Sequence, residues 1–257
     1  MIEINHLCKS FGNNIILSDL SLTIKSGETK VIIGRSGAGK SVLLKNIIGL
    51  LRPDQGSIKV NGTEVTALSE KELNKIRMEI GMVFQGGALF DSLSVGENVA
   101  FVLDEFMKLD AKTVRDKVAD SLAMVGLKDI EHLMPSQLSG GMKKRVSLAR
   151  VLCMEPQIIL YDEPTSEVDP ITADAINNII IEMRDKLKVT SIVVTHDMNS
   201  AYKVADTIAM FYRGRVIAEG TPEEIRSTKH PVVKQFIYGE AKGPITDDEN
   251  LIFGHVK

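Results

Sequence analysis

The eight residues GRSGAGKS, at positions 34 to 41, restrict the possible folds of this chain more than any other stretch of its sequence. They fit the pattern G-x-x-x-x-G-K-[ST], and they lie between the run TKVII, residues 29–33, and the helix-like run SVLLKNIIGLL, residues 41–51. A short run that ends in continuous apolar residues is typical of a strand buried on both faces. The sequence therefore predicts a buried strand, then a glycine loop, then a helix.

The glycine loop has the composition of a phosphate-binding loop. Its glycines let the backbone curl so that successive N–H groups and the helix N-terminus face one anion. Lys40 can reach the β- and γ-phosphates of ATP, and the Ser41 hydroxyl can take a place on Mg²⁺. The alternative is a plain glycine turn before a surface lysine. The candidate nucleotide-binding residues are Gly34, Arg35, Ser36, Gly37, Ala38, Gly39, Lys40, Ser41 and Val42.

Three further strand ends supply candidate catalytic groups. The run IILYDEP, residues 158–164, predicts a second buried strand, after which Asp162 would hold Mg²⁺ and Glu163 would accept the proton of an attacking water. VVTHD ends a third strand with His196, which can bond the γ-phosphate or the water. Gln85 follows the strand-like IGMVF, and its amide oxygen can bind Mg²⁺ or the water. Taken singly, each group has a structural alternative: a cap or turn carboxylate, a satisfied structural histidine, and a solvated loop glutamine.

The segments around these motifs predict an α/β protein with two additions. The runs IEIN, LSDLSLTIK and SIKV, the last followed by Asn61-Gly62, predict antiparallel strands at the start of the chain. Residues 94–153 are helix-like, with a capping box at Ser94 and Glu97, and they predict a helical subdomain. After these residues, strand-like and helix-like segments alternate, which is typical of a parallel sheet with helices on its faces.

LSGGM, residues 138–142, begins a second helix that can bind an anion; we call it the signature motif. The hydroxyl of Ser139 and the backbone N–H groups at Gly140 and Gly141 form the candidate anion site. The basic residues 143–145 that follow are predicted to be a solvated face, with attraction of phosphate as the alternative.

The ordered set of GRSGAGKS, Gln85, LSGGM, YDEPTSEVD and His196 resembles the nucleotide-binding domain of ABC ATPases over residues 2–239. The resemblance implies a P-loop NTPase fold of the ABC-ATPase type, with a RecA-like core, an antiparallel β-subdomain and an inserted α-helical subdomain at about 86–155. It also implies a second ATP-binding domain as partner. In that family two domains pair head to tail, and each signature motif closes on the ATP held by the other domain. The resemblance therefore implies that Ser139, Gly140 and Gly141 bind the partner's nucleotide.

Two further positions take roles from the family pattern. Phe11 would stack on adenine, although a core phenylalanine on a strand fits the same pattern. Asp169 would be the D-loop aspartate at the dimer seam. The stretch TSEVD departs from the common form of the family, because Glu167 and Val168 stand where small and apolar residues are usual. This departure bears on how the two ATP sites are coupled.

A second resemblance concerns the type of transporter. FQGGALFDSLSVGENVAF, LSGGMKKRVSLAR, the Arg35-containing GRSGAGKSVLLK and the extension YGEAKGP are similar to Mla/Mce-type ATPases, which power lipid traffic between bacterial membranes. The similarity implies transmembrane permease subunits, an Mce-domain lipid-binding protein and a peripheral place on the cytoplasmic side of the bacterial inner membrane. Two alternatives stay open: the ATPase of an amino-acid or metal-ion importer, and a division-type switch that moves no cargo.

Charge and hydropathy exclude other classes. The formal net charge of −3 gives no overall basic surface of the kind that holds a nucleic-acid backbone, so we expect no nucleic acid as partner. We expect the chain itself to stay in the cytosol, because no apolar run reaches the roughly 18 residues that cross a bilayer. Residues 240–257 are predicted to be a tail outside the core, whose apolar Leu251-Ile252-Phe253 either docks on a neighbouring subunit or belongs to a disordered end.

Overall fold

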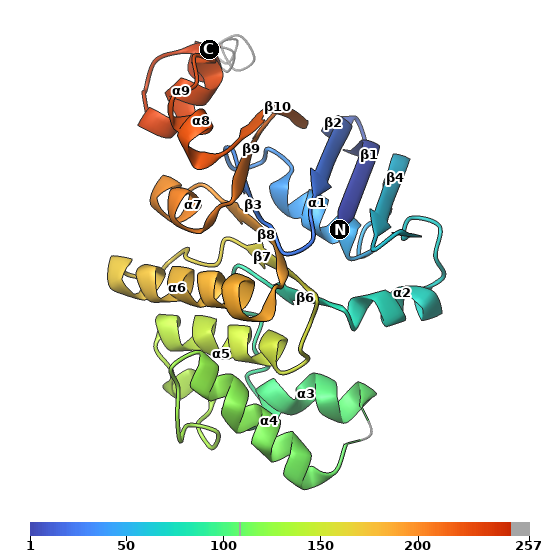
Figure 1. Cartoon of the computed structure of the whole chain (residues 1–257), viewed down its shortest axis with the longest axis vertical. Helices are drawn as coiled ribbons and strands as arrows, with labels where there is room; N and C mark the ends of the chain where they lie inside the picture. The colour runs from blue at the N-terminus through green and yellow to red at the C-terminus, as the bar shows by residue number, and fades with distance from the viewer. Residues whose placement is uncertain (108, 248–257) are drawn as a thin grey trace.

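Two β-sheets organise the chain (Figure 1). The computed structural model describes residues 1–107 and 109–247. The larger sheet has the strand order β10-β9-β3-β8-β7-β6, and the smaller one has the order β2-β1-β4-β5. The strands of the larger sheet are β3 (Thr29–Ile33), β6 (Ile80–Val83), β7 (Ile158–Asp162), β8 (Thr190–Thr195), β9 (Thr207–Tyr212) and β10 (Arg215–Gly220). Those of the smaller sheet are β1 (Ile2–Phe11), β2 (Asn14–Ile24), β4 (Gln55–Val60) and β5 (Thr63–Glu64).

The central strands of the larger sheet are parallel and buried. β3 pairs with β8 on one side and with β9 on the other, and β7 joins β8 to β6. Every residue of β3, β6, β7 and β8 is buried, as the apolar runs predicted. Because parallel strands end at the same edge of a sheet, the loops after these four strands lie together, and ligands of open α/β sheets bind at such an edge.

The opening strands form the predicted antiparallel sheet. β1 pairs with β2 and with β4, and the turn at Asn61-Gly62 joins β4 to β5, with Val60 opposite Thr63. Helix α1 (Lys40–Ile47) lies between the two sheets in Figure 1, and its residues Leu43 and Leu44 share one buried core with residues of both. This packing holds the start of α1, and with it the glycine loop, in a fixed place.

The predicted helical subdomain is formed by α3 (Val95–Phe106), α4 (Ala111–Met124) and α5 (Gly140–Leu152), with a short 3₁₀ turn at Pro135–Gln137. The capping box at the start of α3 is confirmed, because Ser94 accepts from the Glu97 N–H and Glu97 accepts from the Ser94 N–H. Helix α5 packs against α3, α4 and also β6. It is therefore the helix that joins the subdomain to the larger sheet.

Most of the remaining helices pack on the larger sheet, but the last one packs on the helix before it and lies away from the sheet (Figure 1). The remaining helices are α2 (Glu70–Arg77), α6 (Pro170–Leu187), α7 (Met198–Val204), α8 (Pro222–Arg226) and α9 (Pro231–Tyr238). Across residues 1–107 and 109–247, no helix combines the length and the apolar character needed to cross a membrane.

The expectation that residues 240–257 lie outside the core is wrong for the part that the structure describes. Ile245 is only 5% exposed, and its N–H donates to the Gln235 side chain of α9 at 2.7 Å. The Thr246 hydroxyl accepts from the same side chain at 3.2 Å. The buried isoleucine and the hydrogen bonds to Gln235 thus hold this segment against α9. Leu251-Ile252-Phe253 lies outside the described residues.

Candidate active site

The glycine loop after β3 is a tight turn in which residues with a side chain cannot replace Gly34 or Gly39. Gly34 and Gly39 have φ angles of 151° and 95°, in the region that favours glycine. A Cβ at Gly34 would lie 2.5 Å from the Phe211 carbonyl oxygen, and one at Gly39 would lie 2.9 Å from the Ile16 carbonyl oxygen. The loop therefore lies against β9 on one side and β2 on the other, and its N–H groups lead directly into α1.

Lys40 is buried at the first position of α1. Its ammonium donates to the carbonyl oxygens of Gly34 and Arg35, at 2.7 and 3.1 Å, so the side chain folds back over the loop. Burial lowers the pKa of Lys40, and the carboxylates of Glu163 and Asp162 oppose that shift. The predicted alternative of a surface lysine is wrong, because only 7% of the residue is exposed.

The two acids at the end of β7 contact the glycine loop and the loop after β8. Asp162 accepts from the Ser41 hydroxyl at 2.7 Å. The Glu163 carboxylate has Lys40 Nζ 3.8 Å from one oxygen and His196 Nδ1 3.0 Å from the other. These side chains come from three loops that are distant in the sequence, and the parallel sheet brings them to one edge.

Lys40, Ser41, Glu163 and His196 line a cavity of about 320 Å³, and Asp162 lies behind Ser41. Its lining residues are Ile16, Ser36, Gly37, Gly39, Lys40, Ser41, Val42, Gln85, Glu163 and His196. A cavity of this size is typical of a small-molecule site. It brings together candidate groups from all four strand ends, including Gln85 after β6.

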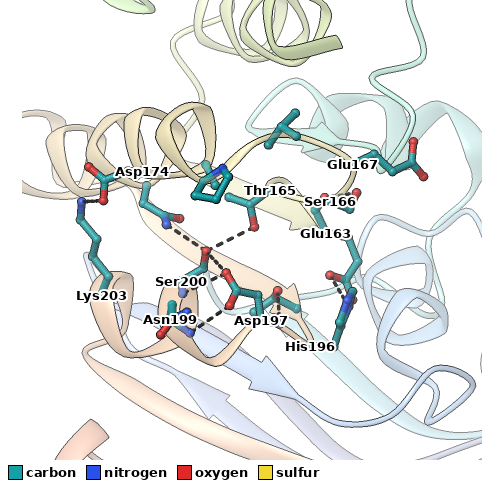
Figure 2. A pocket seen from close by; sticks show the side chains of 15 residues that line it. Glu163, Thr165, Ser166, Glu167, Asp174, His196, Asp197, Asn199, Ser200 and Lys203 are labelled. Carbon is teal, nitrogen blue, oxygen red and sulfur yellow. Dashed lines mark hydrogen bonds and ion pairs between the residues drawn. The ribbon is translucent and has the colours of Figure 1, made fainter.

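A second cavity, of about 380 Å³, adjoins the first at Glu163 and His196 (Figure 2). Beside it, the buried Ser200 hydroxyl bonds three polar side chains: it donates to Asp197 at 2.6 Å, accepts from Asn177 at 2.9 Å and lies 3.3 Å from the Thr165 hydroxyl. Asp197 also caps α7. This network joins the loop that carries Glu163 to the loop that carries His196, and the sequence analysis missed it.

Nine candidate residues do not line the first cavity: Gly34, Arg35 and Ala38 of the glycine loop, Asp162 at the end of β7, and Phe11, Ser139, Gly140, Gly141 and Asp169. Ser139 and Gly140 are exposed at the start of α5, where Ser139 caps the helix by accepting from the Met142 N–H at 3.2 Å. Asp169 is exposed and caps α6. Gly141 follows on α5, and Phe11 stands at the end of β1. Because Phe11 is 49% exposed, the alternative of a core phenylalanine is wrong.

The prediction of a solvated basic face after the signature motif is wrong for Lys144. Only 7% of Lys144 is exposed, and its ammonium donates to the carbonyl oxygen of Gln85. The sequence does carry a signal for this burial, because Leu148 and Val151 follow at i+4 and i+7 and give α5 a second apolar face. Sequence reasoning therefore missed one residue that contacts the site loops.

The fold and the site define a P-loop nucleoside triphosphatase. The defining features are the glycine loop between the buried parallel strand β3 and α1, the lysine that folds over it, and an acid pair at the end of β7, which is separated from β3 by β8. The predicted α/β fold class is thereby confirmed.

Comparison with known proteins places the chain within that class. The family described as ABC transporter matches residues 17–166. A probable ribonucleotide transport ATP-binding protein, mkl of Mycobacterium tuberculosis, is 45% identical, over 95% of this chain and 68% of that protein. The intermembrane phospholipid transport system ATP-binding protein MlaF of Haemophilus influenzae is 40% identical, over 95% of this chain and 93% of that protein. The methionine import ATP-binding protein MetN 4 of Oceanobacillus iheyensis is also 40% identical, over 96% and 73%.

A solved structure agrees with these relatives. The ATP-binding cassette MJ0796, as a dimer in a post-hydrolysis state bound to ADP and Pi, has a TM-score of 0.80 and 33% identity, covering 86% of this chain and 99% of that chain. The chain belongs to the ABC transporter family. It is an ATP-hydrolysing subunit of an ABC transporter, and the resemblance to the ABC ATPases is confirmed.

Proposed function

We propose that this chain powers the transport of phospholipid between bacterial membranes. The observation that carries the proposal is the similarity to the phospholipid-transport protein MlaF, which spans nearly the whole of both chains. The stretches that follow Gln85 and the signature motif support it, since both are similar to Mla/Mce-type ATPases. The methionine-import relative, at the same identity, favours one second candidate: the ATPase of an amino-acid importer.

The proposed chemistry takes place in the 320 Å³ cavity. The N–H groups of the glycine loop, the start of α1 and the Lys40 ammonium bind the triphosphate. Glu163 is the general base, which accepts a proton from the water that attacks the γ-phosphate. His196, 3.0 Å from the Glu163 carboxylate, orients that carboxylate and bonds the γ-phosphate. Gln85 lines the same cavity and orients the water.

The oxygen donors in and beside this cavity fit Mg²⁺. The Ser41 hydroxyl and the Asp162 carboxylate lie 2.7 Å apart, and Gln85 adds an amide to the cavity wall. Mg²⁺ prefers oxygen ligands, and in such sites it is held by one or two carboxylates together with substrate phosphates. Ser41, Asp162 and Gln85 are the proposed ligands. The ion, when bound, would neutralise charge that develops on the β- and γ-phosphates.

Two copies of the chain would act together, head to tail. The exposed start of α5 lies outside its own cavity, which supports a role for Ser139, Gly140 and Gly141 on the partner's nucleotide. Asp169 would lie at the seam between the copies, and Phe11 would stack on adenine. ATP would favour the closed pair and hydrolysis the open one, so the bound permease is driven between two states at the cytoplasmic face of the inner membrane.

Co-purification tests the proposed cargo. We expect the tagged chain, extracted from its native membranes in mild detergent, to retain a permease, an Mce-domain protein and bound phospholipid. Mass spectrometry of the proteins and lipids in the eluate is the measurement. If the eluate contained a permease with an amino-acid-binding protein and no phospholipid, the result would contradict phospholipid transport and support the amino-acid importer.

A pair of variants makes this experiment specific. Phe90 is exposed, and its ring packs on Phe101 at a centroid distance of 4.7 Å. Both residues lie in the stretch after Gln85, which the resemblance to ABC ATPases implies helps to form the groove for the permease. Phe90→Ser is expected to remove most of the permease from the eluate. Leu187→Ser, which replaces an apolar residue at the end of α6 that is 54% exposed against 44% for Phe90, is the matched control and is expected to retain it.

A further inference from the structure

Lys144 is a buried lysine that has no role in the function proposed above. It lies on α5, five residues after Ser139, and its ammonium is directed to the loops after β6 and β7. It donates to the Gln85 carbonyl oxygen, to the Ser166 hydroxyl at 3.2 Å and to the Glu163 carbonyl oxygen at 3.5 Å. An ammonium has three N–H donors, so these three acceptors match its capacity. A buried charge is costly unless it is bonded in this way.

The acceptor at Glu163 belongs to a strained part of the backbone. Glu163 has a φ of 49°, in the left-handed region that residues other than glycine rarely adopt. Its carbonyl oxygen also accepts from the Ser166 hydroxyl at 2.9 Å and from the Ser166 N–H at 3.2 Å, while its own N–H donates to Val194 at 3.0 Å. The backbone of the proposed base is therefore held on both sides, and Lys144 bonds both the carbonyl and the serine that holds it.

Charge is consistent with this arrangement. Burial lowers the pKa of Lys144, and the carboxylates of Glu167, Glu163 and Asp162 oppose the shift. Glu167 is one of the two residues that depart from the common pattern of the family, and among these carboxylates it opposes the shift most. The departure thus supplies negative charge near a buried cation.

We propose that Lys144 is a positioning residue for ATP hydrolysis, which fixes Gln85 and Glu163 relative to each other and to the signature helix α5. The start of α5 is the part that would meet the partner's ATP. A movement of this helix would therefore be passed through the Lys144 side chain to the ATP site of the same chain. Lys144 lines neither the phosphate loop nor the cavity, so it acts through the two residues that it holds. The inference rests on the proposal that Glu163 is the base.

Replacing Lys144 with methionine tests the inference on the full chain. Because a small misplacement of a catalytic group is costly, we expect Lys144→Met to lower kcat at saturating ATP and Mg²⁺ at least ~10-fold. The dissociation constant for ATP, from equilibrium binding, should change less than about 3-fold, since uniform binding is untouched. Lys144→Arg keeps the donors and should recover most of kcat. Lys112→Met, at an exposed lysine of α4 in the same subdomain, is the matched control and should hydrolyse ATP normally.

Ser166→Ala gives an independent test, in case Lys144→Met does not fold. It removes the hydroxyl that bonds both Lys144 and the Glu163 carbonyl, and it should also lower kcat with little change in ATP affinity. Normal kcat in both variants would overturn the inference. So would a parallel loss of kcat and ATP affinity that Lys144→Arg does not restore, because that result describes a residue needed only for folding. Normal hydrolysis by Glu163→Gln would instead contradict the role of Glu163 as the general base. That result would overturn the proposed chemistry and is distinguishable from a failure of the inference on Lys144.

Discussion

Glu163→Gln is expected to stop ATP turnover while ATP still binds. The amide has nearly the shape of the carboxylate but cannot accept a proton from water, and loss of a general base typically costs about 10²- to 10⁴-fold in rate. The phosphate-binding groups, Lys40 and the glycine loop, are unchanged, and a negative charge 3.8 Å from Lys40 Nζ is removed. ATP should therefore hold the variant as a closed pair. Steady-state phosphate release and the molecular mass in solution, with ATP and Mg²⁺, measure the two effects.

The control for this prediction makes the same chemical change away from the site. Glu182 lies on α6 and pairs with Lys186 in a solvated i, i+4 contact, so Glu182→Gln should hydrolyse ATP at the natural rate. If Glu163→Gln retained near-normal turnover, Glu163 would not be the base. If the variant lost turnover but stayed a single chain in the presence of ATP, the result would support Glu163 as the general base and contradict the ATP-trapped closed pair.

Much of the candidate site could be predicted because its residues follow buried parallel strands. A strand such as IILYD is recognisable from its apolar run, and the strands of a parallel sheet end at one edge. It follows that Lys40, Gln85, Glu163 and His196 come together although they are spread over more than half of the chain. The register of the sheet was not needed for this step. The distances that join Glu163 to Lys40 and to His196 came only from the structure.

Residues whose burial depends on several neighbouring elements could not be predicted in the same way. Leu148 and Val151 indicate a second apolar face on α5, but only the packing of this helix against α3, α4 and β6 shows that its basic side is covered at Lys144. Phe11 is exposed for the opposite reason. It pairs with Asn14 at the tip of the β1–β2 hairpin, beyond the part of β1 that β4 covers.

Strand β10 was missed although its turn carries a local signal. Arg213 and Gly214 both have positive φ angles, 50° and 73°, and they join β9 to β10 as a two-residue hairpin turn. The alternation in RVIAEG is too weak to indicate a strand by itself. An edge strand that pairs on one side needs fewer apolar residues than a central one, and this explains the difference from β3 and β7.

Lys40→Ala is expected to weaken ATP binding and to abolish turnover. The ammonium is the buried cation of the glycine loop, and a hydrogen bond to a charged group contributes about 1.5–3 kcal/mol, which corresponds to roughly 10- to 100-fold in affinity. Thermal unfolding gives a direct measurement, because a ligand at 100 times its dissociation constant stabilises the folded state by about 2.7 kcal/mol. The stabilisation that ATP gives to the natural chain should largely disappear in the variant at the same ATP concentration.

The matched control for Lys40→Ala lies on the same helix. Lys45→Ala removes a lysine from the last turn of α1, where it loses only a favourable interaction with the helix dipole of about 0.3–1 kcal/mol. ATP should stabilise this control as it does the natural chain, even if the control melts slightly earlier. An unchanged response of Lys40→Ala to ATP would contradict the assignment of the glycine loop as the phosphate site, because no other lysine lines the cavity among the residues that the structure describes.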